Sequence, residues 1–201
     1  MERIAAVVLA GGQGRRMGGA DKAFMPLGGR PLIAHVLARL APQCPVLAIS
    51  AGGDPARFAT FGVPVVADAM AGFPGPLAGI LAGLDAAAAA VPPFALVLSV
   101  PADAPFLPDD LVARLLTARQ AEKAAIAMAA SAGRRHPVIA LWPVELRAGL
   151  RAALAAGERK VEEFAARHRL AVVEWPTAPR DPFLNVNTPA DLAAAEAALA
   201  S

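Results

Sequence analysis

The sequence has few of the residues that build disulfide, zinc or base-stacking sites. Cysteine occurs once, at Cys44, which excludes an intrachain disulfide and a zinc site made of cysteines. Aromatic residues make up 5% of the 201 residues and tyrosine is absent, so surfaces for stacking nucleic-acid bases are scarce. The formal net charge is only +2, too small for a dedicated nucleic-acid groove or a basic membrane anchor. We therefore expect neither nucleic acid nor a membrane as a partner.

Long apolar runs and targeting signals are also lacking. The longest uncharged stretch, residues 86–102, contains three prolines and is short for a bilayer. The apolar residues near the N-terminus lead to Arg15 and Arg16 rather than to a cleavage site. We expect a cytoplasmic protein whose residues 1–201 form one domain, since a domain averages roughly 150 residues.

Short apolar runs alternate with alanine-rich helical segments along most of the chain. The runs typical of strands are 4–9, 46–49, 63–66, 94–100, 124–129, 138–142 and 170–175, and the helical segments are 31–40, 77–90, 107–119, 144–156, 161–167 and 188 onward. This order predicts the α/β class, as a single Rossmann-like three-layer domain with a mostly parallel central sheet. Ligands of such sheets bind beyond the carboxyl ends of the strands.

A glycine-rich loop follows the first predicted strand. It runs from Leu9 through Gly11, Gly12 and Gly14 to Lys22, and it also carries two arginines. Glycines let backbone N–H groups approach phosphate oxygens, and the cations add the charge that a triphosphate attracts. A flexible turn with solvated cations is the alternative interpretation. A dinucleotide fingerprint is excluded because Met17 stands at its third glycine position, and a P-loop because no Gly-Lys pair exists.

Several motifs together resemble the nucleotidyltransferases, and most of all the molybdenum cofactor guanylyltransferase family. They are, in chain order, the loop 9–22 with Arg16-Met17-Gly18 and Asp21-Lys22, Gly75-Pro-Leu-Ala-Gly79, Pro101-Ala-Asp-Ala-Pro105, Gly157-Glu-Arg-Lys-Val161 and Asn185-Val-Asn-Thr-Pro189. The loop alone is shared with sugar and terpenoid nucleotidyltransferases and indicates only the reaction class. The ordered set spans nearly the whole chain and is much more specific.

The resemblance implies a role for particular residues. It implies that Arg16, Lys22 and Asp103 are catalytic, and that Asp103 also binds Mg²⁺ as the cofactor. The nucleotide-binding positions that it implies are Leu9, Ala10, Gly11, Gly12, Lys22, Ser50, Asp68, Gly75 and Asp103. Those on the side of the pterin are Arg135, His136, Arg159, Asn185 and Asn187.

Some of these positions have a second interpretation from the sequence alone. Asp103 follows a strong strand and lies between two prolines, so it suits Mg²⁺, but a loop aspartate can also accept local backbone hydrogen bonds. Asn185 and Asn187 could bind a pterin edge or hold loop backbone. Ser50 stands where the family often has asparagine and offers one donor rather than two.

The activity implied is the transfer of GMP from GTP to the terminal phosphate of molybdopterin, with release of pyrophosphate. The partners implied are GTP and molybdopterin as substrates, with transient contact with the apo-enzymes that receive the cofactor. The Gly11-Gly12 form of the loop accompanies guanine in this family, and the use of CTP is the nearest alternative. A non-catalytic module that delivers cofactor, and a purely structural scaffold, are alternatives from other classes.

Overall fold

The computed structural model describes residues 2–11, 21–44, 46–67 and 75–200. Its strands are β1 (Ile4–Leu9), β2 (Pro26–Leu27), β3 (Arg30–Pro31), β4 (Val46–Ser50), β5 (Val65–Val66), β6 (Leu96–Pro101), β7 (Ile126–Ser131), β8 (Arg134–Pro143) and β9 (Leu170–Trp175). Its α-helices are α1 (Leu32–Leu40), α2 (Pro76–Ala89), α3 (Leu111–Ala121), α4 (Arg147–Ala155), α5 (Val161–Ala165) and α6 (Pro189–Ala200). Short 3-10 helices are η2 (Lys22–Phe24), η3 (Pro55–Phe61) and η4 (Val144–Leu146).

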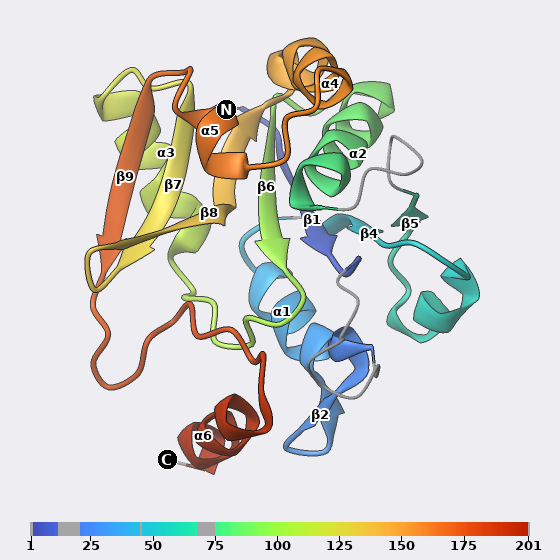
Figure 1. Cartoon of the computed structure of the whole chain (residues 1–201), viewed down its shortest axis with the longest axis vertical. Coiled ribbons are helices and arrows are strands. Elements are labelled where there is room, and N and C mark those ends of the chain that lie inside the picture. The colour runs from blue at the N-terminus through green and yellow to red at the C-terminus, as the bar shows by residue number, and fades with distance from the viewer. Residues whose placement is uncertain (1, 12–20, 45, 68–74, 201) are drawn as a thin grey trace.

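Seven strands form one twisted sheet in the order β5-β4-β1-β6-β8-β7-β9 (Figure 1). Strand β1 pairs in parallel with β4 and β6, and β7 pairs in parallel with β9. Only β8 runs antiparallel to its neighbours within this sheet. The alternating pattern of the sequence therefore predicted the α/β class and the mostly parallel sheet correctly.

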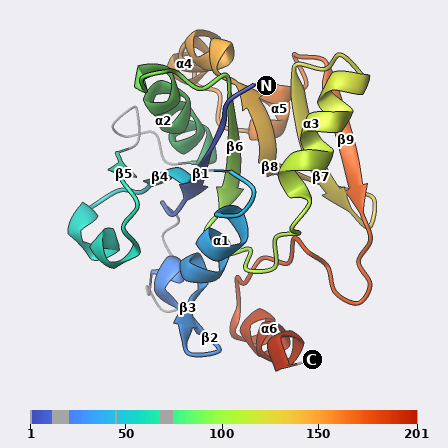
Figure 2. The same cartoon turned by 180° about the vertical axis from the view of Figure 1, so that it is seen from behind.

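Helices cover both faces of the sheet and make it the middle of three layers (Figures 1 and 2). On one face, α1 and α3 pack on side chains such as Val8, Leu98 and Leu141. On the other, α2, α4 and α5 pack on side chains such as Val7 and Trp142. Successive side chains of a strand point to opposite faces, so each central strand contributes to both apolar layers. This explains why its sequence reads as a continuous apolar run.

Two glycines bring α2 close to the sheet. A Cβ atom added to Gly79 would lie 2.8 Å from Leu9 Cδ2 and from Ser50 Oγ. One added to Gly83 would lie 2.7 Å from Val7 Cγ1 and 2.8 Å from Val7 Cβ. The missing side chains let the first turns of α2 lie directly on β1 and β4, beside the edge where these strands end.

Replacing Gly83 by alanine is expected to destabilise the fold by about 1–3 kcal/mol, because the new methyl group overlaps a stiff β-branched side chain in the core. Urea unfolding measures this loss. The matched control is Gly149→Ala in α4, where no atom lies within 4 Å of the added Cβ and alanine is the better helix former. Equal stability of the two variants would contradict this account of the packing.

A smaller apolar cluster lies beyond the carboxyl ends of the strands. The β2–β3 hairpin and α6 pack there through Leu27, Leu32, Phe106, Val186 and Ala195. Glu196 Oε1 accepts a hydrogen bond of 2.8 Å from the backbone N–H of Gly28. Segments from both ends of the chain are thus held side by side below the sheet in Figure 1.

The bounds of several elements differ from the sequence prediction. The third helix begins at Leu111 rather than at residue 107, and the Asp110 side chain accepts from Trp175 Nε1 at 2.9 Å instead of capping the helix. Strand β8 begins at Arg134, earlier than predicted, because Gly133 with φ +71° makes a tight turn that pairs residues 134–136 with β7. The 3-10 helix η3 and the β2–β3 hairpin were not predicted, since neither has a sustained apolar period. In the described part of the chain, no helix is both long enough and apolar enough to cross a membrane.

Candidate active site

The carboxyl ends of β1, β4 and β6 meet at one edge of the sheet. The backbone N–H of Ala10 donates to Ser50 O at 2.8 Å, and that of Ala102 donates to Leu9 O at 3.0 Å. The backbone N–H of Val186 donates to Asp103 O at 2.9 Å, which ties the segment before α6 to the same edge. The end of β1, the segment around Asp103 and the segment before α6, which stand far apart in the sequence, therefore meet here.

Lys22, Asp103 and Asn187 form the centre of this edge. Lys22 Nζ lies 3.5 Å from Asp103 Oδ2 and donates to Asn187 Oδ1. The side chains of Lys22 and Asp103 are only 18% and 17% exposed, so solvent screens their interaction less than at an open surface. The structure thus brings together a predicted catalytic cation, the predicted metal ligand and one residue predicted for the pterin side.

Burial raises the pKa of the Asp103 carboxyl above its usual value, although attraction and a hydrogen bond from Lys22 act in the opposite direction. Removing a carboxylate from water disfavours its charged form, and a single lysine does not compensate fully here. Additional positive charge beside this carboxylate, such as a bound cation, would therefore favour its ionised form.

A capping box holds Asn187 in place. Asp191 Oδ2 accepts from the backbone N–H groups of Asn187 at 2.9 Å and Thr188 at 2.8 Å, and Thr188 Oγ1 accepts from the Asp191 N–H at 3.1 Å. These contacts lower the pKa of Asp191, with the Asn187 backbone as the largest cause. These reciprocal contacts form a capping box at Thr188, which fixes the backbone of Asn187, the residue that accepts from Lys22.

An ion pair that the sequence did not suggest supports the turn before Lys22. Arg57 Nη1 lies 2.6 Å from Asp21 Oδ2, and Asp21 Oδ1 also accepts from the backbone N–H of Ala23 at 3.2 Å. Arg57 comes from η3 and lies over the Phe58 ring, 4.8 Å from its centroid. Only the packing of η3 against η2 brings these groups together, so no local pattern could have identified Arg57.

The predicted nucleotide-binding residues separate into three groups. Gly11 and Gly75 are exposed at the site edge, and Gly75 has φ +146°, a conformation that favours glycine. Leu9, Ala10 and Ser50 are partly or fully buried at the strand ends, and Ser50 is only 1% exposed with its Oγ close to Gly79 of α2. Gly12 and Asp68 lie outside the described residues, as does Arg16, which was predicted to be catalytic.

The residues predicted for the pterin side are more dispersed. Asn185 has a buried Oδ1 atom without a hydrogen-bond partner in the described structure, next to Asn187. His136 Nε2 lies 2.7 Å from Ser131 Oγ, its ring lies 4.9 Å from that of Phe183, and burial lowers its pKa.

Two arginines predicted for the pterin side have partners near α5. Arg135 lies 3.7 Å from Glu162 of this helix. Arg159 Nη1 donates to the carbonyl oxygens of Leu154 and Glu158. Both guanidinium groups therefore have partners within the protein, and the structure does not bring them to the Lys22–Asp103–Asn187 cluster.

The described residues fit a magnesium ion better than a zinc ion. No cluster of three or more His, Cys, Asp or Glu side chains suited to a metal occurs among them. Mg²⁺ needs only one or two carboxylates, with substrate phosphates and water completing its shell. The single buried carboxylate of Asp103 satisfies that requirement.

Comparison with known proteins agrees with this arrangement. Residues 6–172 match the family model described as a MobA-like NTP transferase domain. The chain is 62% identical over 192 residues to a molybdenum cofactor guanylyltransferase of Rhodopseudomonas palustris (strain BisB5), covering 95% of this chain and 91% of that protein.

Solved structures show the same fold at lower identity. The molybdopterin-guanine dinucleotide biosynthesis protein A of Archaeoglobus fulgidus aligns over 98% of both chains with a TM-score of 0.75 and 24% identity. A Mycobacterium tuberculosis H37Rv protein crystallised with manganese aligns over 97% of this chain and 98% of its own, with a TM-score of 0.66 and 17% identity. The chain belongs to the family of MobA-like NTP transferases and is a nucleotidyltransferase.

Proposed function

We propose that this enzyme transfers GMP from GTP to the terminal phosphate of molybdopterin, forming molybdopterin guanine dinucleotide and pyrophosphate. The observation that carries the proposal is the contact of Lys22 with Asp103 and Asn187 at the sheet edge. The 62% identity to a guanylyltransferase over 95% of this chain supports it. Release of pyrophosphate by the purified protein with GTP, molybdopterin and Mg²⁺ tests it. Absence of pyrophosphate under these conditions would rule the proposal out.

The chemistry asks the protein for positioning and charge rather than for a covalent intermediate. An oxygen of the pterin phosphate attacks the α-phosphorus of GTP, the new P–O bond forms, and the bond to the β-phosphate oxygen breaks as pyrophosphate leaves. Lys22, fixed by Asn187, offers a buried positive charge to these oxygens. Arg16 is proposed to offer a second one. Among the described residues, none combines a nucleophile with an adjacent base at this edge.

Asp103 is proposed to bind Mg²⁺, which would neutralise charge on the triphosphate when bound. The raised pKa of this carboxyl supports the assignment, because a nearby divalent cation stabilises its charged form. Lys22 contacts the same carboxylate, and its charge and hydrogen bond favour the ionised form of Asp103 and orient the side chain.

The pterin is proposed to bind next to Asn185 and Asn187. The unpartnered Oδ1 of Asn185 is a buried acceptor that a ring N–H can satisfy, and burying it without a partner costs about 1–3 kcal/mol. His136, whose ring lies 4.9 Å from that of Phe183, is proposed to extend this side of the site. Arg135 points to the other face of the sheet, where it pairs with Glu162 of α5. Apo-enzymes that receive the product are proposed as transient partners.

Titration with nucleotides distinguishes GTP from CTP as the substrate. A ligand that binds only the folded state at a hundredfold excess over its dissociation constant stabilises it by about 2.7 kcal/mol. We expect GTP with Mg²⁺ to raise the melting temperature, and CTP at equal concentration to have a much smaller effect. A larger shift with CTP would assign the enzyme to the cytidylyl reaction instead, and it would leave the reaction type unchanged.

A further inference from the structure

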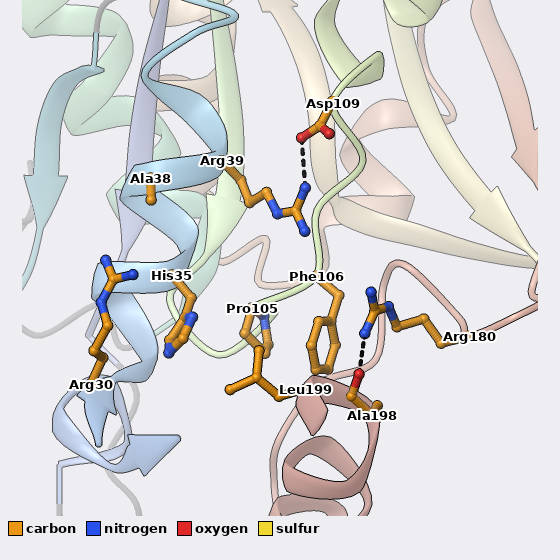
Figure 3. Close-up of a pocket in the computed structure, with 10 residues that line it drawn as sticks. All are labelled: Arg30, His35, Ala38, Arg39, Pro105, Phe106, Asp109, Arg180, Ala198 and Leu199. Carbon is orange, nitrogen blue, oxygen red and sulfur yellow. Dashed lines mark hydrogen bonds and ion pairs between the residues drawn. The ribbon is translucent and has the colours of Figure 1, made fainter. Parts of the chain in front are cut away.

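A pocket of about 500 Å³ lies on the outer side of the loop that carries Asp103 (Figure 3). It is bounded by α1, by the end of α6 and by the residues after Asp103, and its lining residues are separate from those assigned above to the nucleotide or the pterin. They are Arg30, His35, Ala38, Arg39, Pro105, Phe106, Asp109, Arg180, Ala198 and Leu199. Its volume lies within the range of small-molecule sites.

Two guanidinium groups converge in this pocket. Figure 3 shows Arg39 and Arg180 reaching toward the space above the Phe106 ring from opposite sides. The Arg180 guanidinium lies 4.8 Å from the centroid of that ring and donates to the Ala198 carbonyl at the end of α6. Both groups are therefore already oriented toward the same space, which lowers the entropy cost of binding an anion between them.

The positive charge of the pocket is only partly compensated. Arg39 pairs with Asp109 at 2.7 Å, but the Asp109 side chain is 78% exposed, and such exposed pairs are weak. Arg30 has no ion-pair partner among the residues that the structure describes. His35 is used structurally, since its Nε2 donates to Leu27 O at 2.9 Å. The lining contains three arginines and one aspartate, so its formal charge of +2 is equal in size and opposite in sign to that of a doubly ionised phosphate group.

We propose that this pocket binds a small phosphate monoester that carries a flat, largely apolar ring. The guanidiniums of Arg39 and Arg180 donate charge-assisted hydrogen bonds to the phosphate oxygens, and Arg39 exchanges Asp109 for the ligand. The ring packs against the wall of Pro105, Phe106 and Leu199. The proposal does not depend on the reaction at the sheet edge, because none of these residues belongs to the Lys22–Asp103–Asn187 cluster.

Isothermal titration calorimetry with phenyl phosphate, without nucleotide or metal, tests the proposal. Wild-type protein is expected to bind phenyl phosphate more tightly than inorganic phosphate, and phenol not measurably. Arg39→Gln and Arg180→Gln are each expected to weaken binding by about tenfold. Asp109→Asn removes the competing carboxylate and is expected to strengthen binding about two- to fivefold.

Two controls locate the binding. Arg147→Gln removes an exposed arginine of α4, which lies at the opposite end of the molecule from α6, and should leave affinity unchanged (Figure 1). Lys22→Met should also leave it unchanged, and loss of binding in that variant would place the ligand in the nucleotide site and overturn the proposal. Unchanged affinity in folded Arg39→Gln and Arg180→Gln proteins, or equal binding of phenol, would overturn it as well.

Discussion

Asp103→Asn is expected to reduce turnover on the order of a thousandfold, the scale of losing one preorganised charged contact in a transition state. Asparagine keeps the size and one oxygen of the side chain but removes the negative charge that would bind Mg²⁺. The backbone carbonyl of Asp103, which accepts from Val186, is untouched. The loss should therefore appear in kcat with a folded protein, and raising Mg²⁺ should not restore it.

The same substitution is expected to raise the thermal stability of the metal-free protein. Burial is the largest influence on the Asp103 pKa and it opposes ionisation more strongly than Lys22 favours it. The charged carboxylate therefore costs free energy at neutral pH in the folded state, and the neutral amide avoids that cost. The melting temperature of both proteins is measured in EDTA. A variant that is inactive but melts at a higher temperature than wild type would show that Asp103 serves function rather than stability.

Asp85→Asn is the matched control for both measurements. Asp85 lies on α2 and pairs with Arg151 at 2.5 Å, away from the strand ends. Its replacement should leave turnover unchanged and should not stabilise the protein. A fully active Asp103→Asn enzyme would contradict the metal assignment, whereas the delivery-module alternative requires that Asp103 variants still transfer preformed cofactor to an apo-enzyme.

Lys22→Met is expected to lower kcat/KM for GTP about a hundred- to a thousandfold, because methionine keeps the apolar stem and removes the charge that is proposed to stabilise the triphosphate. The loss should appear in KM as well as kcat if the lysine contacts phosphate oxygens both in the bound substrate and during transfer, as proposed. Steady-state pyrophosphate release over a range of GTP concentrations measures both constants. Lys123→Met, at an exposed position after α3, is the control with the same chemical change.

Coupling between Lys22 and its neighbours sharpens this test. Asn187→Ala leaves the charge of Lys22 but removes the oxygen that accepts from its Nζ, so we expect a smaller loss of about tenfold. Because Lys22 and Asp103 are in contact and both are proposed to act on the triphosphate, the double variant Lys22→Met/Asp103→Asn should lose much less than the product of the single effects. Full additivity would show that the two side chains act independently.

Much of the fold could be predicted from local patterns. Apolar runs identified the strands of the sheet, although the strand predicted at residues 63–66 is only the two-residue strand β5 in the structure. Alanine-rich segments identified the helices, including α6, which was expected from residue 188 onward and begins at Pro189. Bounds were wrong where a distant partner takes a side chain, as Trp175 takes the carboxylate of Asp110 at the start of α3. Such long-range contacts cannot be inferred from the spacing of apolar residues along the chain.

By itself, the sequence determined the α/β class, and it predicted that the site lies beyond the carboxyl ends of the strands and which residues form it. Apolar periodicity and helix caps report the preferences of neighbouring residues, so they can be interpreted locally. Only the tertiary structure decided that Lys22 contacts Asp103, 81 residues away, and Asn187, 165 residues away, and that Ser50 is turned into the core. Those contacts depend on how α2, α6 and the β2–β3 hairpin pack together, because burial and charge at a site are properties of the assembled layers.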